Sequence, residues 1–186
     1  MRRARRSDRA RFRGRLLLLL VVSALALPVR ASALTVAAMP LEEMTGYATL
    51  VVRARCIDRQ VTRSPDGRIE SLARFTVLEE AKGSATGVVT VRQLGGRIED
   101  RELVVPGAPL SEPGDDVVLF LEPYDGEVLG VVGLALGYMP VAVLPGSGAA
   151  VRVARTLGGS FASGGVRPVT ELLERVRGIV TQQGTR

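Results

Sequence analysis

Short apolar segments, each closed by proline, glycine or charged residues, are the feature that most limits what this chain can fold into. They recur at intervals of about ten residues, as strands of a small β domain do. In order along the chain, they occupy residues 48–57, 68–80, 88–94, 117–121, 128–134, 138–144 and 150–154. About six or seven strands with few helices predict a mainly β fold. A small barrel and a β-sandwich both satisfy this pattern, and periodicity does not choose between them.

The alternation within the first segment predicts which face of that strand is buried. The even positions Leu50, Val52, Ala54 and Cys56 are apolar or weakly polar, and side chains two apart share one face of a strand. Cys56 is therefore predicted to be a small buried hydrophobe and not a reactive thiol.

The remaining segments define the organisation of the chain. A short helical lead is expected over 34–47, the β-barrel domain over 48–156 and a Gly- and Ser-rich link over 157–168. A closing helix is expected over 169–181, because Thr170 can cap it and apolar residues follow at helical spacing. Residues 97–115 mix charges with prolines and glycines, so they are predicted to be a long, mostly irregular connection.

The first 33 residues have the composition of an export signal. Eight arginines stand against one acid in residues 1–15, and residues 16–27 are apolar except for Ser23. Small residues at Ala31 and Ala33 fit a cleavage site. We therefore predict a signal peptide over 1–33 and export to the periplasm or the medium. Because a membrane span needs about 20 apolar residues and Arg30 interrupts this stretch, contact with the membrane is expected only if the signal is left uncleaved.

The positive net charge of the chain, +6, comes from this N-terminal segment, which alone carries +8. Nine of the 25 basic residues and one of the 19 acidic residues lie in residues 1–33. The rest of the chain carries 16 basic and 18 acidic side chains, a net charge of −2. A basic surface for nucleic acid is therefore not expected.

Histidine is absent, which removes the commonest general base and metal ligand. Cys56 is the only cysteine, so neither an intramolecular disulfide nor a Cys-His nucleophile pair can form. Neither a cofactor nor a metal is predicted.

Four stretches carry a resemblance to known proteins: residues 50–54, 75–83, 89–91 and 114–121. Their order is an apolar strand, a long strand ending in Lys82-Gly83, a Val-rich strand, and Gly114-Asp115 before a Leu/Phe strand. This order resembles a broad group of secreted bacterial proteins of unassigned function, and it is similar to the netrin-like domain of tissue metalloprotease inhibitors. The resemblance covers about residues 40–144 and implies an OB-like β-barrel of about six strands. It gives Lys82, Gly83, Gly114 and Asp115 structural roles, at a strand end and a turn.

The inhibitory mechanism of that family does not carry over to this chain. In the family, an N-terminal cysteine chelates the protease zinc and disulfides brace the barrel. Here the predicted mature terminus is Leu34, and a single cysteine leaves no disulfide within the chain.

The sequence favours a non-catalytic binding or accessory domain that acts as a monomer on an extracytoplasmic protein or a small ligand. The long connection is the candidate surface, because long loops in compact domains are often functional. Its candidate binding residues are Arg92, Gly95, Gly96, Arg97 and Arg101, with Glu99, Asp100 and Glu102 beside them. An ordinary solvated loop of mixed charge is the structural alternative. A module acting on a secreted protease, inhibitor-like or propeptide-like, is the functional alternative.

A hydrolase with paired carboxylates is the less favoured possibility. The nearest acid doublets are Glu79-Glu80 and Asp115-Asp116, but neighbours on a strand point to opposite faces. No catalytic residue is therefore assigned. Asp115, Asp116 and Asp125 also lack the spacing of a calcium loop, so no metal ligand is assigned either.

Overall fold

The computed structural model describes residues 39–85, 87–144, 148–153 and 165–184. The predicted signal peptide, its cleavage residues Ala31 and Ala33, and residues 157–164 of the predicted link lie outside the described residues. The helices are α2 (Leu41–Tyr47) and α3 (Val169–Gly184). The strands are β1 (Leu50–Arg63), β2 (Ile69–Lys82), β3 (Val88–Leu94), β4 (Gly96–Ile98), β5 (Arg101–Leu103), β6 (Asp116–Asp125), β7 (Val128–Val131), β8 (Tyr138–Leu144), β9 (Gly148–Val153) and β10 (Gly165–Pro168).

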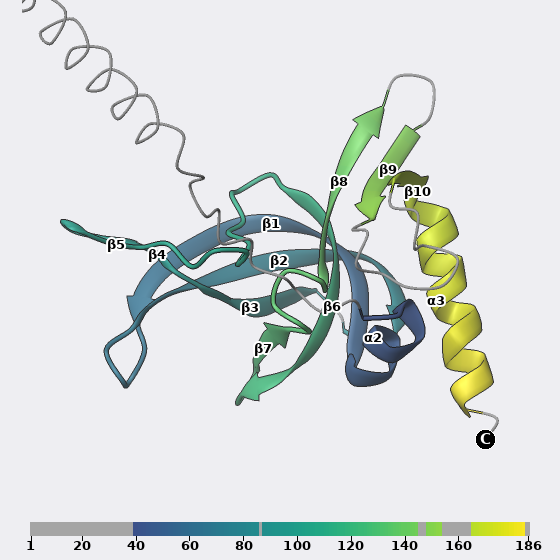
Figure 1. The fold of residues 1–186 in the computed structure, drawn as a ribbon, viewed down its shortest axis with the longest axis horizontal. Coiled ribbons are helices and arrows are strands. Elements are labelled where there is room, and N and C mark those ends of the chain that lie inside the picture. Colours follow the sequence, from purple (N-terminus) through teal and green to yellow (C-terminus); the bar gives the residue numbers. More distant parts are fainter. Residues whose placement is uncertain (1–38, 86, 145–147, 154–164, 185–186) are drawn as a thin grey trace, which may run out of the picture. The chain divides into compact units, whose positions relative to one another are not determined.

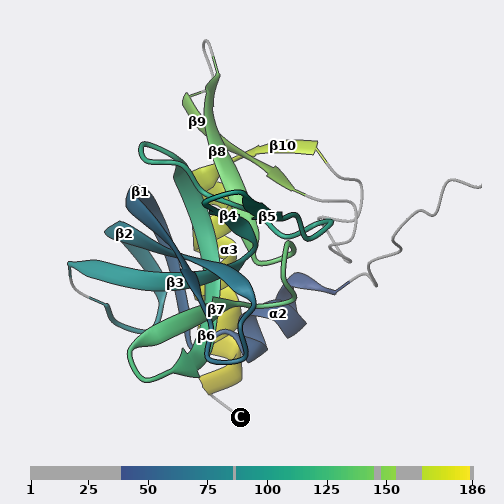
Figure 2. The ribbon, with the colours of Figure 1, turned by 90° about the vertical axis from the view of Figure 1, so that its left-hand side faces the viewer.

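Eight strands form one mixed sheet in the order β1-β2-β3-β7-β6-β8-β9-β10 (Figures 1 and 2). Five of them make a partial ring, because β6 also pairs with β1 along Leu50–Arg55. The pairs β1/β2, β2/β3 and β6/β7 are antiparallel, whereas β3 and β7 run parallel. The mainly β prediction is confirmed, together with the C-terminal helix. The predicted barrel is wrong, because the ring is partial and β6 continues the sheet through β8 to β9 and β10.

The two central strands β1 and β6 are buried on both faces, which explains their almost continuous apolar sequences. Val51 and Phe120 point into a core shared with the helices, and Val52 and Leu119 point into a second core inside the ring. Alternation along each strand divides its side chains between the two cores. Cys56 belongs to the inner core and is buried, as predicted.

Helix α3 closes the outer core. Its buried residues follow the helical repeat and pack with α2 and the sheet face: Val169, Leu172, Leu173, Val176 and Ile179. Figure 1 shows α3, in yellow, beside β9, β10 and α2. Arg177 joins this helix to β2 by an ion pair of 2.6 Å with Glu79.

The connection after β3 is more regular than predicted. Residues 96–98 and 101–103 pair as the antiparallel hairpin β4–β5, with Arg97 opposite Glu102. Glu99 begins the turn in a left-handed conformation, with φ of 56°. Residues 97–115 were predicted to be mostly irregular, and after this hairpin residues 104–115 contain neither strand nor helix. Within the hairpin, cross-strand hydrogen bonds pair backbone groups of a segment that has no apolar face. In Figure 1 the hairpin projects at the end of the sheet away from α3.

Candidate functional site

The predicted binding residues lie in two neighbourhoods. Arg92 is on β3 and lines a small pocket of about 140 Å³ with Tyr124 and Glu122. Arg97 and Arg101 are exposed on the β4–β5 hairpin. They line neither this small pocket nor the larger cavity beside Tyr138. The structure therefore does not bring the three arginines into one pocket.

Gly95 and Gly96 connect these neighbourhoods and have structural roles. Both have positive φ, and a Cβ on Gly95 would lie 2.5 Å from the Leu103 carbonyl oxygen. A Cβ on Gly96 would lie 2.6 Å from Val61 Cγ1 and 2.8 Å from Ser71 Oγ. Glycine at both positions lets the hairpin leave the sheet close to β1 and β2.

Arg92 is held by protein groups. Its Nε donates to Glu70 at 2.5 Å, and its guanidinium lies 4.3 Å from the centre of the Tyr124 ring. The two paired side chains are only 13% and 10% exposed. Arg92 is therefore a partly buried structural residue, although it borders the small pocket.

Each of the four predicted structural residues lies where two segments of the chain come close together. Lys82 Nζ donates to the Thr45 carbonyl at 2.6 Å, and a Cβ on Gly83 would lie 2.5 Å from the Thr49 carbonyl oxygen. Gly114 N–H donates to the Cys56 carbonyl at 2.8 Å, and Cys56 N–H donates to the Asp115 carbonyl at 2.8 Å. The turn that contains Gly114 and Asp115 is thus anchored on β1.

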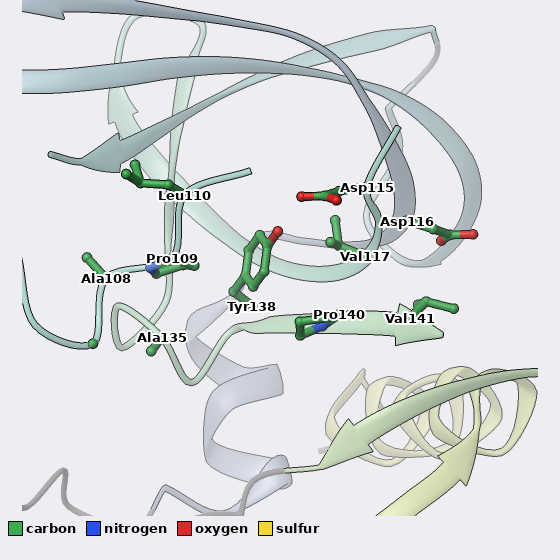
Figure 3. Close-up of a pocket in the computed structure, with 11 residues that line it drawn as sticks. Ala108, Pro109, Leu110, Asp115, Asp116, Val117, Ala135, Tyr138, Pro140 and Val141 are labelled. Carbon is green, nitrogen blue, oxygen red and sulfur yellow. The ribbon is translucent and has the colours of Figure 1, made fainter. Parts of the chain in front are cut away.

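The larger cavity of about 530 Å³ lies beside this anchored turn (Figure 3). Three chain segments build its walls: the connection before β6, the first residues of β6, and the start of β8 with the turn that precedes it. The lining residues are Gly107, Ala108, Pro109, Leu110, Asp115, Asp116, Val117, Ala135, Tyr138, Pro140 and Val141. Sequence reasoning selected only Asp115 and Asp116 among them, since no local pattern shows that the connection and β8 meet.

A buried chain of hydrogen bonds positions Tyr138 at this cavity. Gln93 Nε2 donates to Ser111 Oγ at 2.7 Å, and Ser111 Oγ donates to Tyr138 Oη at 3.0 Å. Ser111 N–H also donates to Gln93 Oε1 at 2.9 Å, so both the nitrogen and the oxygen of the Gln93 side-chain amide form hydrogen bonds. Burial raises the pKa of Tyr138, and the Asp115 charge contributes in the same direction, against the hydrogen bond from Ser111. The phenol therefore stays neutral at physiological pH.

The two carboxylates at the cavity have different surroundings. Asp116 accepts from Arg53 Nε at 3.0 Å and from Arg53 Nη2 at 2.7 Å, and Arg55 lies 3.6 Å away. The hydrogen bonds to Asp116 raise the pKa of Arg53. Asp115 Oδ2 accepts from the Glu112 N–H at 2.8 Å. In Figure 3 the Asp115 carboxylate points toward the Tyr138 hydroxyl and that of Asp116 points away.

The other acid doublet contributes no second site. Glu79 pairs with Arg177, and Glu80 Oε1 accepts from the Ala85 N–H at 2.7 Å. Within the described ranges, no group of three His, Cys, Asp or Glu side chains is arranged to hold a metal ion. No helix in those ranges is long and apolar enough to cross a membrane.

No protein-family model matches the sequence, and no curated protein matches it.

Proposed function

We propose that the protein is an exported, non-catalytic binding domain whose ligand occupies the larger cavity. The observation that carries the proposal is a cavity of about 530 Å³ with mainly apolar walls and a few fixed polar groups. Ligand pockets have this size and composition, because apolar walls supply affinity and a few polar groups orient the ligand. Tyr138 and Asp115 supply the polar groups, and both are held by hydrogen bonds within the protein.

We further propose that the partial ring is an OB-like domain of the netrin-like kind. The OB-fold arranges five strands in a partly open ring and binds ligands at its face and loops. The order β1-β2-β3-β7-β6, with β1 against β6 and a parallel β3/β7 pair, supports this assignment. Since the family's zinc-chelating cysteine has no counterpart here, the likeness concerns architecture and a binding role.

The cavity favours binding over carboxylate hydrolysis. A paired-carboxylate mechanism needs two acids directed at one substrate bond. Both oxygens of Asp116 accept from Arg53, and its carboxylate points away from that of Asp115. Of these two carboxylates, only that of Asp115 is therefore available to a ligand.

A cavity-filling variant tests the proposed site. Ala135 lines the cavity, whereas Ala142 is exposed on β8 and does not. We expect a fragment mixture to shift the amide NMR signals of Asp115 and Tyr138 in the exported protein. The shifts should be lost in Ala135→Phe and kept in Ala142→Phe. Shifts that cluster elsewhere, or that survive in Ala135→Phe, would refute the cavity as the site.

Export and the protease alternative are tested on the native protein. N-terminal sequencing of protein recovered outside the cytoplasm is expected to begin at or near Leu34. A stoichiometric secreted protease, captured after mild crosslinking, would favour the inhibitor-like or propeptide-like alternative. Recovery of full-length protein in the cytoplasm alone would contradict export.

A further inference from the structure

We propose that the larger cavity selects a positively charged nitrogen group, an ammonium or a guanidinium, carried on an apolar stem. This inference rests on the proposed function, because it names the ligand chemistry of the same cavity. It goes further by predicting the sign of the ligand's charge and the residue that recognises it, Asp115.

The ion pairs of the two cavity carboxylates support a positively charged ligand. Asp116 is neutralised by Arg53 at 2.7 Å, and Arg55 lies 3.6 Å away. Asp115 accepts one backbone hydrogen bond, and no lysine or arginine of the described ranges forms an ion pair with it. The 11 lining residues include no lysine or arginine. Asp115 therefore presents to the cavity a carboxylate that forms no ion pair within the described residues, which favours cations and disfavours anions such as phosphates.

The position of the Tyr138 hydroxyl is the second argument. Its oxygen accepts one hydrogen bond from Ser111 and keeps a second lone pair for a ligand. Figure 3 places this oxygen and the Asp115 carboxylate on the same side of the cavity. Two acceptors directed at one space suit an N–H donor that carries several hydrogens, as ammonium and guanidinium groups do.

The apolar walls of the cavity also support an amine on an apolar stem. Pro109 and Leu110 on one side, and Pro140 and Val141 on β8, present apolar surface next to the two acceptors (Figure 3). Burying the aliphatic stem of an amine against them would add to the affinity supplied by the charged head. A free amine and a lysine or arginine side chain of a partner protein share this chemistry.

The experiment compares n-butylammonium with n-butanol, which has nearly the same shape and no charge. NMR titrations of the exported protein at neutral pH and one fixed ionic strength follow the amide signals of Asp115 and Tyr138. We expect butylammonium to bind about tenfold more tightly than butanol, because a charged donor forms a stronger hydrogen bond with a carboxylate than a neutral hydroxyl does.

Two isosteric variants isolate the charge that is responsible. Asp115→Asn keeps an oxygen for the Glu112 N–H but removes the negative charge, so the preference for butylammonium should disappear. Asp125→Asn removes an equal charge from the exposed β6–β7 turn, which does not line the cavity, and should leave the preference unchanged. Equal affinities for the two probes in the unmodified protein, or an unchanged preference in Asp115→Asn, would overturn the inference.

The fragment screen separates failure of this inference from failure of the proposed function. If neutral or anionic fragments shift the cavity signals and butylammonium does not, the inference is wrong and the cavity remains a binding site. If no compound shifts those signals, the proposed site itself fails. The peptide Ac-Gly-Gly-Lys-Gly-Gly-NH2 distinguishes the two ligand sources. Tighter binding of the peptide than of butylammonium indicates a partner protein, and weaker binding indicates a free amine.

Discussion

At Gly96 the backbone has a φ of 135° and passes close to β1 and β2. Ser71, one of the groups that a Cβ would meet, is buried and donates to the Gly95 carbonyl at 2.8 Å. The space beside this glycine is therefore filled by side chains that are themselves held in place.

We predict that Gly96→Ala lowers the free energy of unfolding by about 2–4 kcal/mol, the sum of an unfavourable φ and a clash with Val61 and Ser71. Gly67→Ala is the matched control, since φ is 82° there and nothing lies within 4 Å of the added Cβ. It should cost only about 1–2 kcal/mol. Urea unfolding measures both values, and equal losses would show that the clash is relieved.

The Glu70–Arg92 pair shows why the role of a single side chain is hard to predict from sequence. Arg92 was predicted to be a candidate binding residue. In the structure Glu70 is buried and holds Arg92 across the β2/β3 pair. The partner of this buried charge lies 22 residues away, and only the sheet register brings it close.

Helix α3 supplies much of one face of the outer core, so its apolar stripe should matter more than its exposed side. Leu173 is fully buried in that core, whereas the next residue, Glu174, is exposed. We predict that Leu173→Ala lowers the free energy of unfolding by about 2–5 kcal/mol, through lost burial and a residual cavity. Glu174→Ala should change it by less than about 0.5 kcal/mol. Similar effects in chemical denaturation would contradict this packing of α3.

The stability of the whole domain should fall at alkaline pH, because it buries groups that must stay neutral. Burial raises the pKa of the Cys56 thiol above its ordinary value of 9.0. As pH rises past about 9, the unfolded chain loses this proton and the folded chain retains it, so unfolding becomes more favourable. Tyr138, with a pKa raised from 10.0, should act in the same direction at higher pH.

We therefore predict that the free energy of unfolding decreases less steeply between about pH 8 and about pH 10 in Cys56→Ala than in the unmodified protein. The variant loses some stability at every pH, but the slope reports only on titration. Denaturant unfolding at several pH values measures it. Parallel curves would show that the thiol titrates alike in the folded and unfolded states.

Local pattern was enough to predict the mainly β class, the buried position of Cys56 and the closing helix, because alternation and helical spacing are properties of neighbouring residues. The buried face that contains Leu50, Val52 and Cys56, for example, was predicted without knowledge of distant contacts. Asp115 was selected there only as a turn residue, through the family resemblance, and as part of an acid doublet.

Only the tertiary structure decided that the ring is partial, that Arg92 is paired, and that the cavity lies between the connection, β6 and β8. Pro109 and Tyr138 are far apart in sequence and line one space because β8 pairs with β6. Strand order and register set such long-range contacts. Both depend on the packing of β1 and β6, whose side chains belong to both cores. The sequence alone therefore determined the kinds of elements and many of their buried faces, while tertiary packing decided where the polar groups that could meet a ligand converge.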